Sequence, residues 1–120
     1  MKSTVLVVDD DPVTRKRLSE RLSSEGFRIL EASNGREALS VLEDVIPSLI
    51  LIDMHMPVMD GWKLVQAIRC YEELANIPVV LMTEGELPET QLPVMRKPID
   101  HEQAVETLRF TLRRGVIAAA

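Results

Sequence analysis

The sequence contains very little cysteine and few aromatic residues. Cys70 is the only cysteine among 120 residues, so the chain cannot form an internal disulfide. No group of cysteine and histidine residues has the spacing of a zinc site. Phenylalanine, tryptophan and tyrosine together make up 3% of the chain, so the core must consist of aliphatic residues and methionine. Cys70 itself is predicted to pack on the third helix as a small apolar side chain.

Long apolar stretches and an excess of positive charge are also missing. No segment approaches the roughly 20 apolar residues that a membrane-spanning helix needs. The apolar run Val5–Val8 is short and is followed by three aspartates, unlike a secretory leader. The formal net charge of -5 makes direct binding to DNA or RNA unfavourable. These features predict a cytoplasmic globular protein with neither a membrane nor a nucleic acid as its direct partner.

Short apolar runs alternate with segments of helical periodicity along most of the chain. Strands are predicted at 4–8, 27–31, 48–52, 78–82 and 93–95, and helices at 13–25, 36–44, 61–73 and 100–114. Strands that are apolar on both faces, separated by amphipathic helices, favour an α/β fold with a parallel sheet covered on both sides. We expect a single domain over 1–120, with a core at about 4–114 and a tail or linker stub at 115–120.

One connection is too short for this pattern. Residues 84–96 separate the fourth predicted strand from Lys97, and they include Gly85, Pro88 and Pro93. Once the last strand is subtracted, about nine residues remain, fewer than the roughly ten to twelve that a crossover with a helix requires. The sequence therefore predicts a loop, or at most one helical turn, where a full helix would otherwise lie.

Polar side chains follow the ends of four predicted strands. The first strand is followed by three carboxylates, the third by one, the fourth by a hydroxyl and the last by an ammonium: Asp9, Asp10, Asp11, Asp53, Thr83 and Lys97. Because parallel strands deliver their carboxyl ends to the same edge of the sheet, we expect these groups to converge there. Asp11, which precedes Pro12, is predicted to cap the first helix. Each residue alone would fit an ordinary structural role, so it is their convergence that indicates a site.

The charges at this edge predict a divalent cation. Asp9, Asp10 and Asp53 would place three negative charges beside Lys97, and clustered carboxylates need a compensating cation. Mg²⁺ prefers oxygen ligands and often binds one or two carboxylates, and its two charges together with that of Lys97 would balance the three aspartates. Such a neutralised site can receive a phosphoryl group, and an aspartate carboxylate is a known type of acceptor.

Four segments carry a resemblance to a known family. They are VLVVDDDP at 5–12, ILIDMHMPVMDG at 50–61, IPVVLMT at 77–83 and RKP at 96–98. Together they resemble the response regulator receiver domains of two-component signalling, over residues 4 to about 114. The resemblance implies a doubly wound, flavodoxin-like sheet of five parallel strands in the order 2-1-3-4-5. It also implies a partner histidine kinase or phosphotransfer protein as phosphoryl donor, and a downstream protein target.

The resemblance assigns a role to each site residue. Asp53 would be the phosphoacceptor, Asp10 would bind Mg²⁺ directly, and Asp9 would help to hold the ion through water. The backbone carbonyl of His55 would be a further metal ligand. Thr83 would hydrogen-bond a phosphoryl oxygen as the switch hydroxyl, and Lys97 would pair with another, with a cis bond between Lys97 and Pro98.

Other functions remain open at this point. The imidazole of His55 could be the metal ligand, although oxygen ligands suit Mg²⁺ better. The domain could be a pseudo-receiver, a docking module that is never phosphorylated, but its Asp, Thr and Lys set is complete. It could also be an aspartate-nucleophile phosphohydrolase, yet the place two residues after Asp53 holds His55 instead of a second acid. We expect a signalling module that handles only its own phosphoryl group, not a metabolic enzyme.

Two positions depart from the family pattern. The short segment between Thr83 and Lys97 resembles the FATGUY type of receiver, in which the fourth helix is shortened. The position two before Arg96, where the family usually has an aromatic switch residue, is Val94. We therefore expect the site chemistry to follow the family and the output surface, including the conformation of 84–93, to differ from it.

Overall fold

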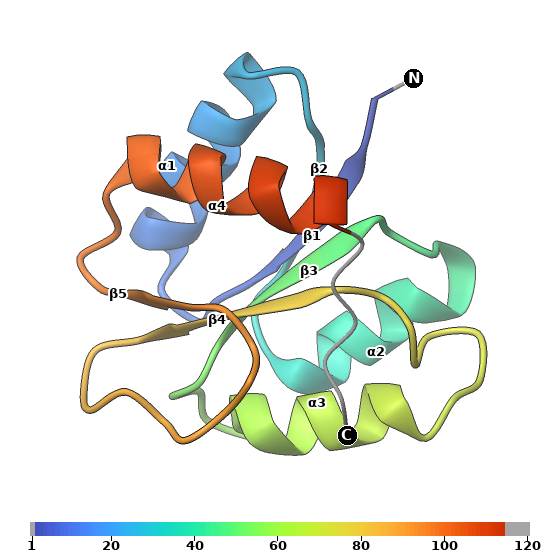
Figure 1. The fold of residues 1–120 in the computed structure, drawn as a ribbon. Coiled ribbons are helices and arrows are strands. Elements are labelled where there is room, and N and C mark those ends of the chain that lie inside the picture. The colour runs from blue at the N-terminus through green and yellow to red at the C-terminus, as the bar shows by residue number, and fades with distance from the viewer. Residues whose placement is uncertain (1, 115–120) are drawn as a thin grey trace.

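A computed structural model describes residues 2–114 of the chain, which form five strands and four helices. Figure 1 shows how these elements are arranged. The strands are β1 (Thr4–Val8), β2 (Arg28–Ala32), β3 (Leu49–Asp53), β4 (Val79–Thr83) and β5 (Val94–Arg96). The helices are α1 (Pro12–Ser24), α2 (Gly35–Asp44), α3 (Gly61–Arg69) and α4 (His101–Arg114). None of these helices is both long and apolar enough to cross a membrane. The predicted tail at 115–120 lies outside the described residues.

The five strands form one parallel sheet in the order β2-β1-β3-β4-β5, which confirms the predicted doubly wound fold. Successive side chains of a strand point to opposite faces of the sheet. In β3, Leu49 and Leu51 face one layer of the core, whereas Ile50 and Ile52 face the other. The continuous apolar runs in the sequence therefore serve two separate hydrophobic layers.

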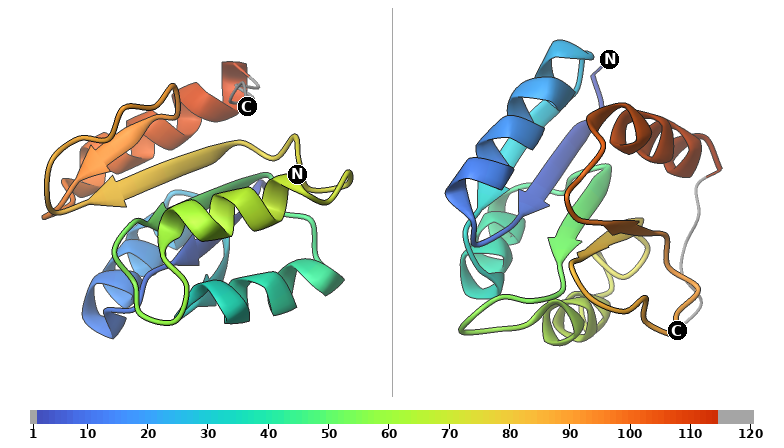
Figure 2. Two further views of the ribbon diagram at one scale, coloured as in Figure 1. Left: turned by 90° about the horizontal axis from the view of Figure 1, so that it is seen from below. Right: turned by 90° about the vertical axis from the view of Figure 1, so that its left-hand side faces the viewer.

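Two helices cover each face of the sheet (Figures 1 and 2). α1 and α4 pack over one face, where Leu18, Leu22 and Leu108 are fully buried. α2 and α3 pack over the other, where Leu64 and Ile68 are buried. This arrangement leaves the carboxyl ends of the strands free of helices, because each helix begins beyond that edge and runs back along the sheet.

The predicted cap of α1 is confirmed, and α3 has a cap of the same kind. Asp11 precedes Pro12 and accepts a hydrogen bond from the backbone N–H of Val13, at 3.1 Å. Asp60 caps α3 by accepting a hydrogen bond from the backbone N–H of Lys63, at 2.9 Å. Because these caps fix where α1 and α3 begin, they also set the path of the loops that carry Asp9, Asp10 and the residues after Asp53.

The connection from β4 to β5 is a loop, as its length predicted. Residues 84–93 contain no helical turn. Near β5, the core on the side of the sheet covered by α2 and α3 is completed by Leu92, which is buried, and by Val94, which is half-buried. The peptide bond between Lys97 and Pro98 is cis, which confirms the expectation taken from the family resemblance.

The predicted helix at 61–73 is too long, and the prediction for Cys70 is wrong. α3 ends at Arg69, and residues 70–76 form turns, in which the N–H groups of Leu74 and Ala75 both bond to the carbonyl of Tyr71. Pro78 disfavours helix in the residue before it, and the turns bury Leu74 and Ile77 in the core. Cys70 is left exposed at the end of α3.

Candidate functional site

The predicted site residues converge at the carboxyl edge of the sheet. Asp9 follows β1, Asp53 ends β3, Thr83 ends β4 and Lys97 follows β5. The sheet register places Asp53 opposite Met82, the residue before Thr83, and Thr83 opposite Arg96, the residue before Lys97. Topology alone therefore brings together four residues that are distant in the sequence.

Lys97 connects the two buried carboxylates. Its ammonium lies 2.8 Å from Asp9 Oδ2 and 3.3 Å from Asp53 Oδ2. Asp9 is fully buried and Asp53 is nearly so, while the Lys97 side chain is 9% exposed. Burial by itself would lower the pKa of Lys97, but its hydrogen bond with Asp9 and the charges of Asp9 and Asp53 raise it above the ordinary value. The lysine is therefore held charged between the two aspartates.

Asp53 is held in a fixed orientation but is costly to ionise. Its Oδ1 accepts a hydrogen bond from the backbone N–H of His55, at 3.1 Å. Burial raises the pKa of Asp53 from 3.8 to about 6, against the lowering effects of the His55 hydrogen bond and the Lys97 charge. The charge of Asp9 raises the pKa further. In the metal-free protein, a single lysine thus only partly compensates the negative charge at this site.

The donor set fits a hard divalent cation. Asp9, Asp10 and Asp53 each offer a carboxylate oxygen, and these oxygens lie within 4.8 Å of one another. Apart from the ion pair with Lys97, the buried Asp9 Oδ2 accepts no hydrogen bond from residues 2–114. Asp10 is exposed and would give an ion access from solvent, whereas Asp9 and Asp53 are buried and would supply the inner carboxylates. Three carboxylates without sulfur or imidazole donors suit Mg²⁺.

The imidazole of His55 lies where the sequence did not predict it. Its Nε2 is 3.3 Å from Thr83 Oγ1, and the same hydroxyl accepts a hydrogen bond from the backbone N–H of Gly85, at 3.2 Å. The spacing of two residues from Asp53 indicated that His55 would be near the site. Its contact with Thr83 depends on a side-chain rotamer and on the neighbouring strand, which sequence periodicity does not specify.

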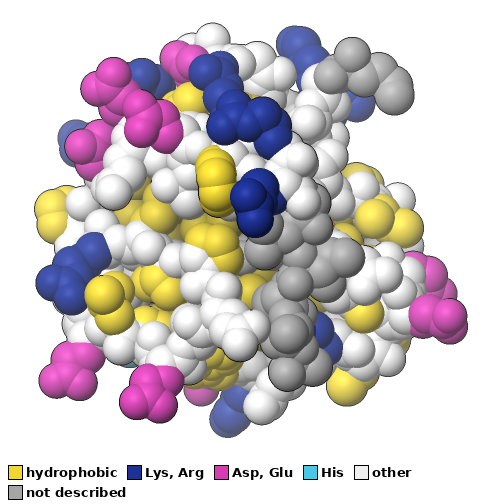
Figure 3. Space-filling view, viewed as in Figure 1, with side chains coloured by type: hydrophobic (Ala, Val, Ile, Leu, Met, Phe, Trp, Pro, Cys, Tyr) yellow, Lys and Arg dark blue, Asp and Glu magenta, His cyan; other side chains and the backbone are white. Residues whose placement is uncertain are grey.

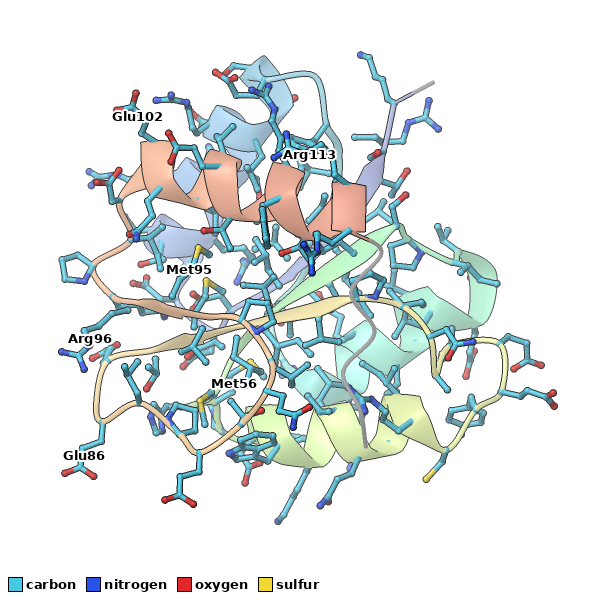
Figure 4. All side chains as sticks on the ribbon, viewed as in Figure 1. Met56, Glu86, Met95, Arg96, Glu102 and Arg113 are labelled. Carbon is cyan, nitrogen blue, oxygen red and sulfur yellow. The ribbon has the colours of Figure 1, made fainter. Side chains whose placement is uncertain are left out.

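The chain around Lys97 forms one wall of a surface cavity of about 450 Å³. Residues from α1, the β4–β5 loop and the start of α4 line it together with Lys97: Thr14, Arg17, Glu84, Pro98, Ile99 and His101. In Figure 4, Arg96 points away from the molecule and Met95 lies between β5 and α4, so the alternation along β5 turns successive side chains outward and inward. Lys97 follows in this alternation and turns back toward Asp9 and Asp53.

Gly61 is required by the close approach of α3 to the end of β3, the strand that ends in Asp53. A Cβ added at this position would lie 2.7 Å from the Asp53 carbonyl oxygen and 2.7 Å from Met54 Cα, both in the backbone. We expect Gly61→Ala to lower the free energy of unfolding by about 1–3 kcal/mol, because the backbone of the loop after Asp53 must shift. Urea unfolding would measure the change. Gly85→Ala is the matched control, since a Cβ there would contact nothing within 4 Å; equal losses for both variants would contradict the explanation.

The raised pKa of Asp53 predicts a specific pH dependence of stability. The pKa of Asp53 is 3.8 when the group is unperturbed and about 6 in the folded protein. Between about pH 4 and pH 6, the folded state therefore binds a proton at Asp53 more often than the unfolded state does. Stability from this group is therefore present at low pH and is lost as pH rises from about 4 to 6. Replacing Asp53 with asparagine, which does not ionise, removes this loss of stability. We expect Asp53→Asn, without metal, to be more stable than the wild type at pH 7.5 by on the order of 1–3 kcal/mol.

Paired urea titrations in EDTA, repeated from pH 4 to pH 8, would measure this difference. Comparing two proteins that differ at one position removes the contributions of the acidic groups that are distant from Asp53. The difference should shrink as pH falls below about 5, where Asp53 is protonated in the folded wild type. A difference that stays constant across the pH range would show that burial of the Asp53 charge is not its origin.

Comparison with known proteins extends the geometric result. Residues 5–109 match a family described as "Response regulator receiver domain". Among curated relatives, "Probable transcriptional regulator ycf27" of Pyropia yezoensis is 34% identical over 122 residues, covering 95% of this chain and 49% of that protein. "Regulatory protein AtoC" of Escherichia coli is 38% identical over 92 residues, covering 77% of this chain and 20% of its own length. The chain thus spans about half the length of the first relative and a fifth of the second.

Solved structures give the same result. The chemotaxis protein CheY4 of Vibrio cholerae superposes with a TM-score of 0.87 at 29% identity, covering 92% of this chain and 98% of that one. A CheY-like receiver domain protein of Methanospirillum hungatei superposes with a TM-score of 0.84 at 28% identity, covering 96% and 98%. The order of elements, the sheet topology and the carboxyl edge are therefore those of a known and widespread fold.

Proposed function

This chain belongs to the response regulator receiver domain family of two-component signalling, and from that premise we propose that Asp53 accepts a phosphoryl group in the presence of Mg²⁺. The observation that carries the proposal is the placement of a buried Asp53 carboxylate 3.3 Å from Lys97, with oxygens of Asp9 and Asp10 close by. Phosphoryl transfer depends mainly on positioning and on neutralising charge, and this arrangement supports both.

Each side chain has a chemical task in this proposal. A carboxylate oxygen of Asp53 attacks phosphorus, an acyl phosphate bond forms, and the bond between phosphorus and the donor's leaving group breaks. Lys97 already contacts Asp53 Oδ2 and pairs with a phosphoryl oxygen of the product. Thr83 turns its hydroxyl to a second phosphoryl oxygen. Asp9, Asp10, Asp53 and the carbonyl of His55 would hold Mg²⁺, which would supply positive charge to offset that of the phosphoryl oxygens.

The partners in this proposal follow from the same chemistry. A phosphohistidine of a sensor kinase or phosphotransfer protein would be the donor. The output would be a contact with a downstream protein, since a net charge of -5 does not favour nucleic acid as a direct partner of this domain. The domain would handle only its own phosphoryl group and would not be a metabolic enzyme.

Incubation with acetyl phosphate and Mg²⁺, followed by intact mass spectrometry, tests the proposal. We expect the mass of one phosphoryl group to be added to the wild-type chain, and none when EDTA replaces Mg²⁺. Acyl phosphates are cleaved by hydroxylamine, so the added mass should disappear with that reagent. A chain that gains no mass in the presence of Mg²⁺ would instead be a docking module. Release of phosphate from small phosphoesters with repeated turnover would indicate a phosphohydrolase.

A further inference from the structure

A groove lies at the edge of the sheet opposite to the candidate site. It has a volume of about 430 Å³ and is formed by the end of α2, the residues that lead into β3, and the turns after α3. Its lining residues are Leu39, Leu42, Glu43, Asp44, Val45, Ile46, Tyr71, Glu73 and Leu74. These segments precede β3 and β4, whereas Asp53 and Thr83 end those strands. The groove is therefore separate from the phosphoacceptor site.

Exposed apolar side chains are concentrated around this groove. Within residues 2–114, seven large hydrophobic residues are exposed, and three of them line it: Val45 at 37%, Ile46 at 62% and Tyr71 at 54% exposed. Single exposed hydrophobic residues are common on monomeric proteins, but their clustering indicates an interaction surface. Leu42 and Leu74, which belong to the core, form its floor.

The rim of the groove is negatively charged and lacks a compensating cation. Glu43, Asp44 and Glu73 are its only charged lining residues, and within the described chain no ion pair joins them to a basic group. On the right of Figure 3, acidic and hydrophobic side chains lie beside one another over the end of α2 and the turns after α3. The surface thus combines an apolar centre with acidic edges.

The C-terminal end of α2 increases this negative potential. A helix C-terminus carries a partial negative charge and is stabilised by basic residues in its last turn. α1, α3 and α4 each have arginine there, whereas α2 has no basic residue in its last turn and ends in Glu43 and Asp44. Among the helices of residues 2–114, α2 is therefore the one whose last turn carries no basic residue, and its end lies where the apolar groove opens.

We propose that this groove binds a short amphipathic basic segment of a partner protein. Apolar side chains of the segment pack against Val45, Ile46 and Tyr71, and its lysine or arginine side chains pair with Glu43, Asp44 and Glu73 and with the carbonyl end of α2. This interaction goes beyond phosphoacceptance, because these residues precede β3 and β4, whereas Asp53 and Thr83 lie at the ends of those strands.

A second copy of the chain is the less suitable occupant. The basic and aromatic surface of this chain lies near the end of α4, where Phe110 is 53% exposed and Arg114 lies over its ring. Insertion of that surface into the groove would join two different faces of the molecule. A contact between two different faces repeats into a ring or an open filament and cannot form a symmetric dimer, which argues for a separate protein as the occupant.

Amide chemical shifts provide the first test. The probe is a synthetic helical peptide of about 12 residues with leucine on one face and lysine flanking it, roughly three turns long. The matched probe has glutamate in place of lysine. We expect the basic probe, added to the ¹⁵N-labelled chain, to shift signals of residues 39–46 and 71–74, and the acidic probe to leave them unchanged. Shifts elsewhere, or equal shifts with both probes, would overturn the proposal.

Two pairs of variants separate specific contacts from the general negative charge of the domain. Reversing charge in the groove with Glu43→Lys and Glu73→Lys should weaken binding of the basic probe roughly tenfold. Reversing Glu20 and Glu106, which are exposed on α1 and α4, changes the net charge equally and should alter binding by less than about twofold. Ile46→Ser should also weaken binding, whereas Leu87→Ser, at a similarly exposed position, should not.

The oligomeric state of the free chain completes the test. All four acidic substitutions and both serine substitutions are at exposed positions, and a thermal melt confirms folding before binding is measured. Sedimentation equilibrium should give a monomer. A self-associated form that Ile46→Ser dissociates would assign the groove to a second copy and overturn the proposal. If the groove pair and the control pair weakened binding of the basic probe equally, the binding would be non-specific charge attraction, and this result would overturn the proposal as well.

Discussion

Replacing Asp53 with asparagine should abolish uptake of a phosphoryl group from acetyl phosphate and Mg²⁺. The asparagine amide has nearly the same shape as the carboxylate, but it lacks the charged oxygen that attacks phosphorus. It also removes one of the three carboxylates that together offer oxygens to a cation. Intact mass should show one phosphoryl group on the wild type and none on Asp53→Asn.

Asp60→Asn is the matched control for this substitution. Asp60 lies in the same loop and caps α3, and asparagine is an equally good helix cap, so the variant should fold and should still gain one phosphoryl group. Uptake by Asp53→Asn at the wild-type level would place the acceptor at another residue. Loss of uptake in both variants would indicate that the integrity of the loop, rather than the Asp53 carboxylate, is what the assay detects.

Replacing Lys97 with methionine should destabilise the metal-free domain by about 3–5 kcal/mol at neutral pH. The lysine ammonium contacts both Asp9 and Asp53, and its removal leaves two buried carboxylates without a compensating charge. Methionine fills a similar volume, so the loss reflects charge more than packing. Phosphoryl uptake should slow by on the order of 10²–10³-fold, because a cation that pairs with the transferred group is gone.

Urea unfolding at several pH values would measure the effect of Lys97→Met. Destabilisation should decrease below pH 5, where Asp53 becomes protonated and no longer needs a cation, and it should decrease again when Mg²⁺ is added. Lys63→Met is the control, since Lys63 is exposed on α3 and its loss should change stability by less than about 0.5 kcal/mol. Equal stability of the Lys97 variant and the wild type would contradict the charge-compensation argument.

Local patterns predicted most of the fold because each depends on neighbouring residues. Asp11-Pro12 determined the start of α1, since a capping side chain and a residue without a backbone N–H favour the first turn. The length of 84–93 excluded a helix before β5, as the loop confirms. Several predicted strands are displaced by one residue, which is the usual uncertainty where pairing with a neighbour decides the last hydrogen bond.

The errors occurred where tertiary packing competed with local periodicity. The apolar stripe of α3 continues toward Glu73, but burial of Leu74 and Ile77 and the proline that follows them end the helix at Arg69. Cys70 is consequently exposed instead of packed. The groove at the end of α2 was equally hidden from sequence, because Ile46 and Tyr71 become neighbours only when the strands that follow them pair in the sheet.

The sequence by itself determined the order of strands and helices, the residue types at each strand end, and the family. Those properties follow from side-chain periodicity, caps and motif spacing, which are local. Only the tertiary structure decided that Lys97 bridges Asp9 and Asp53, that the His55 ring meets Thr83, and that the acidic end of α2 lies beside an apolar groove. Those contacts join residues 28 or more positions apart, or depend on side-chain rotamers and burial. They contribute to stability only after the sheet has brought these distant segments together.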